Sequence, residues 1–135
     1  MKIITFSMGF TLIELLITIV IISVLAAIAY PSYLHFVVYS NRTEAQRELL
    51  RIANLQEQYY IDRRNYTEDM KKLGLANDPF ITDNGYYSVD AKLIDGGFVL
   101  EAKALEYQKN NDSECPFLSV DEKGHKLPVG SCWKQ

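Results

Sequence analysis

One carboxylate stands alone in the first part of this chain. Between Ile3 and Asn41, Glu14 is the only side chain that is certain to be ionised at neutral pH. A carboxylate at membrane depth costs about 2.5–3.5 kcal/mol, and such residues are usually functional. The chemistry available to Glu14 is that of an ion pair, because a buried charge needs a cationic partner. Glu14 is therefore the first candidate site residue.

Two cysteines, Cys115 and Cys132, lie close to each other in the last part of the sequence. In an exported protein such a pair predicts one disulfide, formed in an oxidising compartment. The disulfide would close a loop of roughly 16 residues, for which chain entropy predicts a stabilisation of about 3 kcal/mol. The alternative is two unpaired thiols in a cytosolic protein.

The other polar residues form no catalytic or metal-binding pattern. The sequence contains no nucleophile elbow and no phosphate-binding glycine loop. His125 stands alone between Lys123 and Lys126, and we interpret it, like Asp121 and Glu122, as a solvated residue of a turn. We therefore predict that the protein is not an enzyme and has no metal and no cofactor. Its formal net charge is −3, with basic residues interleaved among acidic ones, so we predict no direct nucleic-acid binding.

The segment that carries Glu14 is almost wholly apolar from Phe10 to Val38, a run of 29 residues. As a helix it would span about 43 Å, which exceeds the roughly 30 Å hydrocarbon core of a membrane. One interpretation is a secretory signal peptide, with Lys2 as its positive region and Ala27-Ile28-Ala29 as its cleavage site. A second is a permanent signal anchor. Neither interpretation explains the carboxylate.

A third interpretation begins from the string Gly9-Phe10-Thr11-Leu12-Ile13-Glu14. This string resembles the type III signal of prepilins, the precursors of type IV pilins. The resemblance implies that a membrane peptidase cuts after Gly9 and that the new N-terminal residue, Phe10, is N-methylated. Residues 1–9 would be the cleaved leader. Residues 10–40 would form a hydrophobic helix that first spans the membrane and later lies in the core of a filament.

The same resemblance assigns roles to two residues of the helix. Glu14 would neutralise the terminal amine of an adjacent subunit, or its own amine before assembly, and would thereby set the axial register. Pro31 stands where pilins commonly carry a proline and would curve the helix; the alternative is that it ends the membrane helix. The chain departs from the common prepilin pattern at Ser7-Met8, because many prepilins carry Lys or Arg before the glycine.

Residues 41–135 are expected to form a globular head. Its helix keeps one face apolar and is expected to end near residues 62–65. Alternation and turn residues then predict antiparallel strands at 86–93, 98–104, 116–120 and 125–129, with Asp95-Gly96-Gly97 as a hairpin signal between the first two. The first two strands are predicted to share a face made of Tyr87, Val89, Ala91, Leu93, Phe98, Leu100, Ala102 and Ala104. The predicted fold class is α+β: a long N-terminal helix packed on a small antiparallel β-meander, stapled by Cys115 and Cys132.

Further segments resemble minor pilins of the PilE class: Ser40–Gln46, and Gln58–Thr67 followed by Leu73-Gly74-Leu75. The resemblance implies a minor subunit that primes or intersperses in a type IV pilus and supports motility, adhesion or DNA uptake. The expected partners are other pilin subunits, the prepilin peptidase and methylase, the inner-membrane assembly platform and, before assembly, the membrane. The chain would be a single-pass inner-membrane protein and then part of an extracellular pilus. A major pilin, a type II secretion pseudopilin and a signal-anchored periplasmic binding domain are the alternatives.

Overall fold

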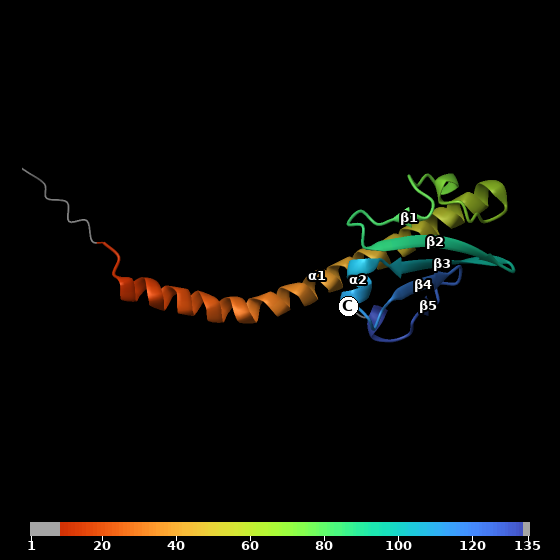
Figure 1. Cartoon of the computed structure of the whole chain (residues 1–135). Coiled ribbons are helices and arrows are strands. Elements are labelled where there is room, and N and C mark those ends of the chain that lie inside the picture. The colour runs from red at the N-terminus through yellow and green to blue at the C-terminus, as the bar shows by residue number, and fades with distance from the viewer. Residues whose placement is uncertain (1–8, 134–135) are drawn as a thin grey trace, which may run out of the picture. The chain divides into compact units, whose positions relative to one another are not determined.

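The computed structural model describes residues 9–133, which divide into two compact units between Phe36 and Val37. The elements are labelled in Figure 1. They are α1 (Leu12–Arg63), the 3₁₀ turn η1 (Met70–Leu73), β1 (Phe80–Ile81), β2 (Tyr87–Ile94), β3 (Gly97–Ala104), α2 (Glu106–Asn111), β4 (Phe117–Asp121), β5 (Lys126–Leu127) and the 3₁₀ turn η2 (Ser131–Trp133).

The first unit contains the N-terminal half of α1, which is long and apolar enough to cross a membrane. Pro31 lies inside α1, and the helix continues on both sides of it. The alternative that Pro31 ends the membrane helix is therefore wrong. Proline removes one backbone hydrogen bond from a helix, and the bonds of the neighbouring turns are enough to carry the helix past it. The expected curvature at Pro31 stays a prediction.

In the second unit, the C-terminal half of α1 packs one face against a sheet. The residues that it buries recur at intervals of three or four positions, as one face of a helix requires, and widen to three consecutive positions at residues 44–46. They are Val38, Asn41, Glu44, Ala45, Gln46, Leu49, Ile52 and Gln56. The helix ends at Arg63, within the predicted range.

The sheet has five antiparallel strands in the order β1-β2-β3-β4-β5, so each strand pairs with its neighbour in the sequence. This confirms the predicted class, a long N-terminal helix on an antiparallel meander. The central hairpin turns at Asp95-Gly96, between β2 and β3, with Ile94 opposite Gly97. Gly96 has φ 78°, which favours glycine, and this is the hairpin signal seen in the sequence.

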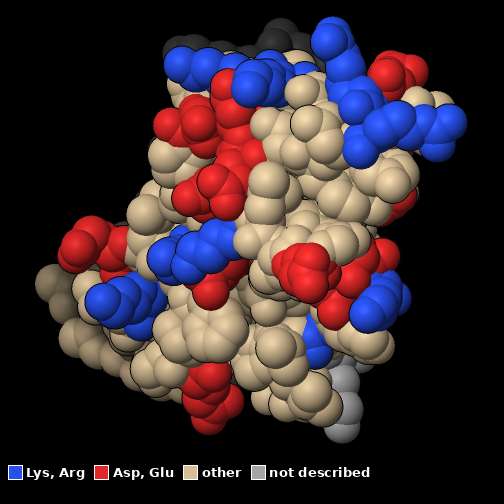
Figure 2. All heavy atoms as spheres, turned by 90° about the vertical axis from the view of Figure 1, so that its right-hand side faces the viewer, with Lys and Arg blue, Asp and Glu red and all other residues tan. Residues whose placement is uncertain are grey.

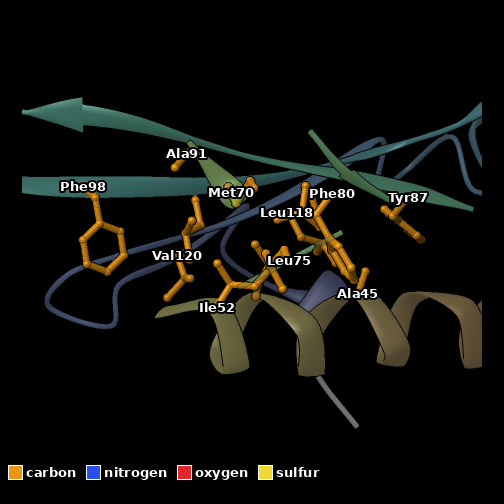
Figure 3. Close-up of a cluster of buried hydrophobic side chains, with 14 of the residues drawn as sticks. Ala45, Ile52, Met70, Leu75, Phe80, Tyr87, Ala91, Phe98, Leu118 and Val120 are labelled. Atoms are coloured by element: carbon orange, nitrogen blue, oxygen red, sulfur yellow. The ribbon is translucent and has the colours of Figure 1, made fainter. Parts of the chain in front are cut away.

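The core lies between the sheet and α1. Figure 3 shows side chains of β2, β3 and β4 meeting Ala45 and Ile52 of the helix, together with Met70 of η1 and Leu75 between η1 and β1. The predicted alternation is confirmed at most positions, since Tyr87, Val89, Ala91, Phe98, Leu100 and Ala102 are all buried. The exceptions are Ala104, which is only partly buried, and Leu93, which is 46% exposed where the end of the hairpin borders an open groove.

Some short elements were not predicted. β1 has two residues and α2 has six, too few for a hydrophobic period to identify them. The strand expected at 125–129 is shorter, Lys126–Leu127, because Pro128 has no backbone N–H to donate to a strand ladder. Cys115 and Cys132 form the expected disulfide, with 5.7 Å between their Cα atoms, and it joins the segment before β4 to η2.

Candidate functional site

The first turn of α1 holds Glu14. Gly9, Phe10 and Thr11 precede the helix, and Thr11 caps it, because its Oγ1 accepts a hydrogen bond from the Glu14 backbone N–H at 3.3 Å. No atom comes within 4 Å of the position that a Cβ would take at Gly9, and Phe10 is 78% exposed. The peptide bond after Gly9 is therefore accessible, with the carboxylate about one helical turn beyond it.

Residues 9–36 contain no Lys or Arg, and Glu14 is their one acidic residue. The ion pairs found among residues 9–133 all lie in the head. Two hydroxyls of the same helix are satisfied internally: Thr18 donates to the Leu15 carbonyl and Ser23 donates to the Ile19 carbonyl, both at 2.7 Å. Residues 9–36 therefore offer Glu14 no lysine or arginine as an ion-pair partner.

Apolar side chains surround this half of α1 on every side. Those between residues 12 and 28 are exposed by half or more of their surface: Leu12, Ile13, Leu15, Leu16, Ile17, Ile19, Val20, Ile21, Ile22, Val24, Leu25 and Ile28. A helix that is apolar all round is stable only where lipid or other helices cover it. This exposed apolar surface carries Glu14 in the first turn of the helix.

In the head, α2 is fastened to α1 by a buried polar network that the sequence did not reveal. Arg42 donates to both carboxylate oxygens of Asp112, with Nε–Oδ2 at 2.9 Å. Gln108, which is fully buried, donates to the Val38 carbonyl at 3.0 Å and to Asp112 at 3.1 Å, and it accepts from Asn41 at 3.1 Å. The network positions α2 at the start of the head.

Charges in this network shift two pKa values. Burial lowers the pKa of Arg42, but the hydrogen bond and charge of Asp112 outweigh it, so the net pKa is raised. Burial, with the nearby charge of Asp112, raises the pKa of Tyr87 to about 12. Both groups therefore keep their ordinary protonation states at neutral pH, and the network contributes to structure and not to proton transfer.

The disulfide region is fixed to α1 by Gln46, whose Nε2 donates to the Cys132 carbonyl at 2.7 Å. Trp133 donates from its indole N–H to the Leu127 carbonyl at 3.0 Å, and the Lys126 ammonium lies 5.0 Å from the centre of its ring. Gln46, Lys126 and Trp133, together with Arg47, line a hollow of about 450 Å³ beside α1. The hollow combines two cations with an aromatic face.

The turn between β4 and β5 is built on Asp121. Its carboxylate accepts from the backbone N–H of Lys123 at 3.0 Å and of His125 at 2.7 Å, and it lies 2.7 Å from the His125 ring nitrogen Nδ1. Burial raises the pKa of Asp121, but the hydrogen bonds from His125 outweigh this effect and lower it overall. His125 is exposed, as expected of a solvated turn residue, whereas Asp121 is only partly exposed, because the turn folds around its carboxylate and brings His125 against it.

The far end of α1 forms the rim of a groove. Tyr60 stacks on Tyr66 with ring centres 4.7 Å apart, and Tyr66 meets the edge of Phe98 at 4.9 Å. Arg64 follows the helix with φ 60° and donates its backbone N–H to the Tyr60 carbonyl at 2.8 Å, which closes the last turn. Glycine is the usual residue at this left-handed position, and another residue there costs about 1–2 kcal/mol.

Charges on the head are mixed. Figure 2 shows acidic and basic side chains lying side by side over the end of the head that carries the groove. Within residues 9–133 no group of His, Cys, Asp and Glu side chains is arranged to hold a metal ion. The candidate sites among the described residues are the Glu14 turn, the apolar helix and the hollows of the head.

Two family models match the chain. A model described as "Prokaryotic N-terminal methylation motif" matches residues 9–30. A model described as "Type IV minor pilin ComP, DNA uptake sequence receptor" matches residues 31–119. The first match contains Gly9, Phe10 and Glu14, and the second contains most of the head but ends before β5 and Cys132.

Curated proteins and a solved structure that resemble this chain are of the same kind as the two family models. The chain is 37% identical to the type IV major pilin protein PilA of Myxococcus xanthus over 50% of its own length and 31% of that protein. It is 42% identical to the wide-pilus major component PilA4 of Thermus thermophilus, over 53% of its own length and 56% of that protein. The chain thus spans about a third to a half of these relatives. It is 32% identical to the major pilin PilE1 of Neisseria gonorrhoeae over 86% of its own length and 68% of that protein. A type IV pilin structure from Shewanella oneidensis covers 73% of this chain with 99% of its own, at 30% identity and a TM-score of 0.55.

Proposed function

The chain belongs to the type IV pilins, and from this premise we propose that it is processed after Gly9, methylated at Phe10 and assembled through Glu14 into a surface pilus. The observation that carries the proposal is the first half of α1: an apolar helix with exposed side chains all round, opened by an accessible Gly9–Phe10 bond and one carboxylate. The prepilin peptidase and its methylase activity are the partners for the first two steps.

Mass spectrometry of the mature N-terminus tests the processing step. We expect a chain that begins with N-methylated Phe10. A mature chain that begins at Tyr30 would instead indicate cleavage of a secretory signal, and an intact Met1 would indicate a permanent anchor. Either result overturns the proposal.

We propose that Glu14 neutralises the terminal amine of Phe10 from an adjacent subunit, or its own amine before assembly. Both charges would otherwise enter an apolar environment unpaired, which is strongly unfavourable. Pairing also fixes the axial register of the incoming subunit. Glu14→Leu should leave membrane insertion intact and prevent incorporation into pili. Normal incorporation of this variant would refute the role of Glu14.

The proposed location follows from the same helix. Before assembly the chain spans the inner membrane once, with its head outside the cytoplasm, where an oxidising compartment allows the Cys115–Cys132 disulfide to form. The assembly platform of the inner membrane then transfers it to the extracellular pilus. Pro31 is proposed to curve the apolar helix during this packing.

Within the pilus we propose a minor role, in which the subunit primes assembly or intersperses along the filament. The ComP model match over residues 31–119 supports this role. The similarity to proteins described as major pilins supports an abundant role instead. Quantification of the chain in sheared pili separates the two, because a minor subunit is expected at a small fraction of the major one.

A second candidate function is contact with DNA, since the matching family model is described as a DNA uptake sequence receptor. The hollow that carries Arg47, Lys126 and Trp133 is the head surface best suited to phosphate and base contacts. The interleaved charges of the sequence predict the contrary. Binding of labelled duplex DNA to intact pili tests the candidate, and Arg47→Glu with Lys126→Glu should abolish binding only if this hollow is the site.

A further inference from the structure

The second half of β2 is an edge of the sheet that has no strand partner in the part of the chain that the structure describes. β3 lies along one side of β2 from Tyr87 to Ile94, whereas β1 pairs only with Ser88 and Val89 on the other side. From Asp90 onward this second side of β2 is therefore not covered by a described strand. An open edge presents backbone N–H and C=O groups to which another strand can add. The functions proposed above make no use of this edge.

Two carboxylates occupy the backbone donors of this edge. The Ala91 N–H donates to Oδ1 of Asp90 at 2.9 Å, and the Leu93 N–H donates to Oε1 of Glu68 at 2.9 Å. Because both N–H groups bond to side chains, they point away from the ladder that β2 forms with β3. Glu68 belongs to the loop between α1 and η1, so it reaches the strand from a distant part of the sequence. The outward donors of the uncovered edge are therefore already satisfied within the head.

The position of Asp90 is unfavourable for the sheet itself. Asp90 lies directly opposite Glu101 of β3, and like charges in opposite positions destabilise a pair of strands. Glu101 has a cation of its own, because the Lys103 ammonium lies 3.2 Å from its Oε1. The ion pairs found among residues 9–133 include neither Asp90 nor Glu68. The contacts that these two carboxylates do make are therefore those with the backbone of the edge.

The other side chains along this edge favour the addition of a strand. Leu93 and Ile94 are 46% and 47% exposed, and exposed apolar side chains on an open edge are typical of strands that associate. Lys92 and Asp95 are also exposed, and their opposite charges give no net repulsion between two copies of the edge. The two carboxylates that bond to the backbone are therefore the groups that oppose association.

We propose that Glu68 and Asp90 close the open edge of β2, so that it does not pair with the same edge of a second copy of this chain. A strand that adds to an edge has to donate to its outward carbonyls and accept from its outward N–H groups. Here it would have to displace both carboxylates. Otherwise its own carbonyl oxygens would face negative oxygens and would be buried without donors, which is unfavourable. This inference concerns the head alone and does not depend on the proposed processing or assembly.

Sedimentation of the full chain tests whether the carboxylates keep the heads apart. A large excess of detergent micelles separates the apolar helices, so that association reports on the heads. Wild type should sediment as single chains, and Glu68→Ala with Asp90→Ala should lower the dissociation constant of the dimer at least about tenfold. Asp95→Asn with Glu106→Ala is the matched control, because it removes as much negative charge and leaves both edge bonds intact. Unchanged association of the edge variant, or equal association of the two double variants, would overturn the proposal.

Amide hydrogen exchange followed by mass spectrometry locates the contact in the dimer of the edge variant. Exchange in the peptide that covers residues 90–94 should slow as the protein concentration rises, because the N–H groups of Ala91 and Leu93 gain carbonyl partners from the second copy. Peptides of α2, which lies outside the proposed contact, serve as the internal reference. Dimers that protect another part of the head and leave residues 90–94 unchanged would refute the inference.

Leu93→Pro separates strand addition from association of a weakened head. Proline removes the outward N–H of residue 93 and no bond between β2 and β3. Added to Glu68→Ala with Asp90→Ala, it should return the protein to single chains. Leu93→Ala in the same background removes the apolar side chain but keeps the N–H, so this control should continue to associate. Association that results from partial unfolding would persist or increase with the proline, and that outcome would contradict the proposed closure of the edge.

Discussion

The buried pair Arg42–Asp112 should be a principal determinant of the stability of the head, and Asp112→Ala is the change that tests this. Asp112 accepts from Arg42 through both carboxylate oxygens and also from Gln108. Its side chain is 4% exposed and that of Arg42 is 15% exposed. The substitution leaves a guanidinium without its counter-charge in a site that water barely reaches.

Loss of one partner from a buried ion pair costs about 3–5 kcal/mol. We expect a value near the lower limit, about 3 kcal/mol, because Arg42 keeps some access to water. The expected loss also includes one hydrogen bond from Gln108, which holds α2 to the Val38 carbonyl. The fluorescence of Trp133, or near-ultraviolet circular dichroism, reports unfolding of the head.

The assay is urea unfolding of the full chain in detergent micelles, because urea, unlike guanidinium, does not screen ion pairs. The double variant Arg42→Met with Asp112→Leu is the matched control. It removes both charges together and should recover most of the lost free energy, since apolar residues can replace a buried ion pair at little cost. A loss below about 1 kcal/mol for Asp112→Ala would show that the pair is solvated and would refute the reasoning.

Other predictions concern the core, the disulfide and pH. Leu49→Ala, at a fully buried position, should lower the free energy of unfolding by about 3 kcal/mol, whereas Leu50→Ala, at a 43% exposed position on the same turn, should change it by less than about 1 kcal/mol; urea unfolding of both variants measures the difference. Replacement of Cys115 and Cys132 by serine should cost about 3 kcal/mol, measured against wild-type protein with and without reductant, and an unchanged midpoint would contradict the prediction. The pKa of Asp121 is lowered in the folded head, so its stabilisation is present above its ordinary pKa of 3.8 and is lost as the pH falls through the lowered value. Asp121→Asn should therefore be less stable than wild type at neutral pH, and the difference should shrink in acid; a constant difference would argue against this linkage.

The sequence was sufficient to predict the structure where one physical signal dominates a long segment. The all-apolar run predicted α1, and the four-residue spacing on its second half predicted the face that Ala45, Leu49 and Ile52 bury. Alternation around Asp95-Gly96 predicted the central hairpin and most of its inward side chains. The even pair of cysteines predicted the disulfide. In each case local preference and burial indicate the same structure.

The features that the sequence did not reveal depend on residues distant in the chain. Gln108 and Asp112 look like surface residues of a polar segment, and their burial becomes visible only when α2 meets Arg42 and Val38. The pairing of Asp121 with His125 depends on the shape of a tight turn. One signal was available for the groove: Arg64 follows the predicted helix end directly, where a glycine is usual.

The two units satisfy their polar groups in opposite ways, and this difference supports the proposed assembly role of Glu14. In the head, polar side chains such as Gln46, Gln108 and Asp112 are buried and bonded to other parts of the same chain. In residues 9–36 the hydroxyls of Thr18 and Ser23 bond to their own helix, and the apolar side chains are left exposed. An apolar helix whose hydroxyls are satisfied internally can pass from lipid to a bundle of similar helices with little change in its contacts. For Glu14 the same transfer changes the free energy, because its charge gains a cationic partner in only some arrangements of neighbouring chains. In the proposed assembly the carboxylate would therefore discriminate between correct and incorrect register, a function that the apolar residues around it cannot supply.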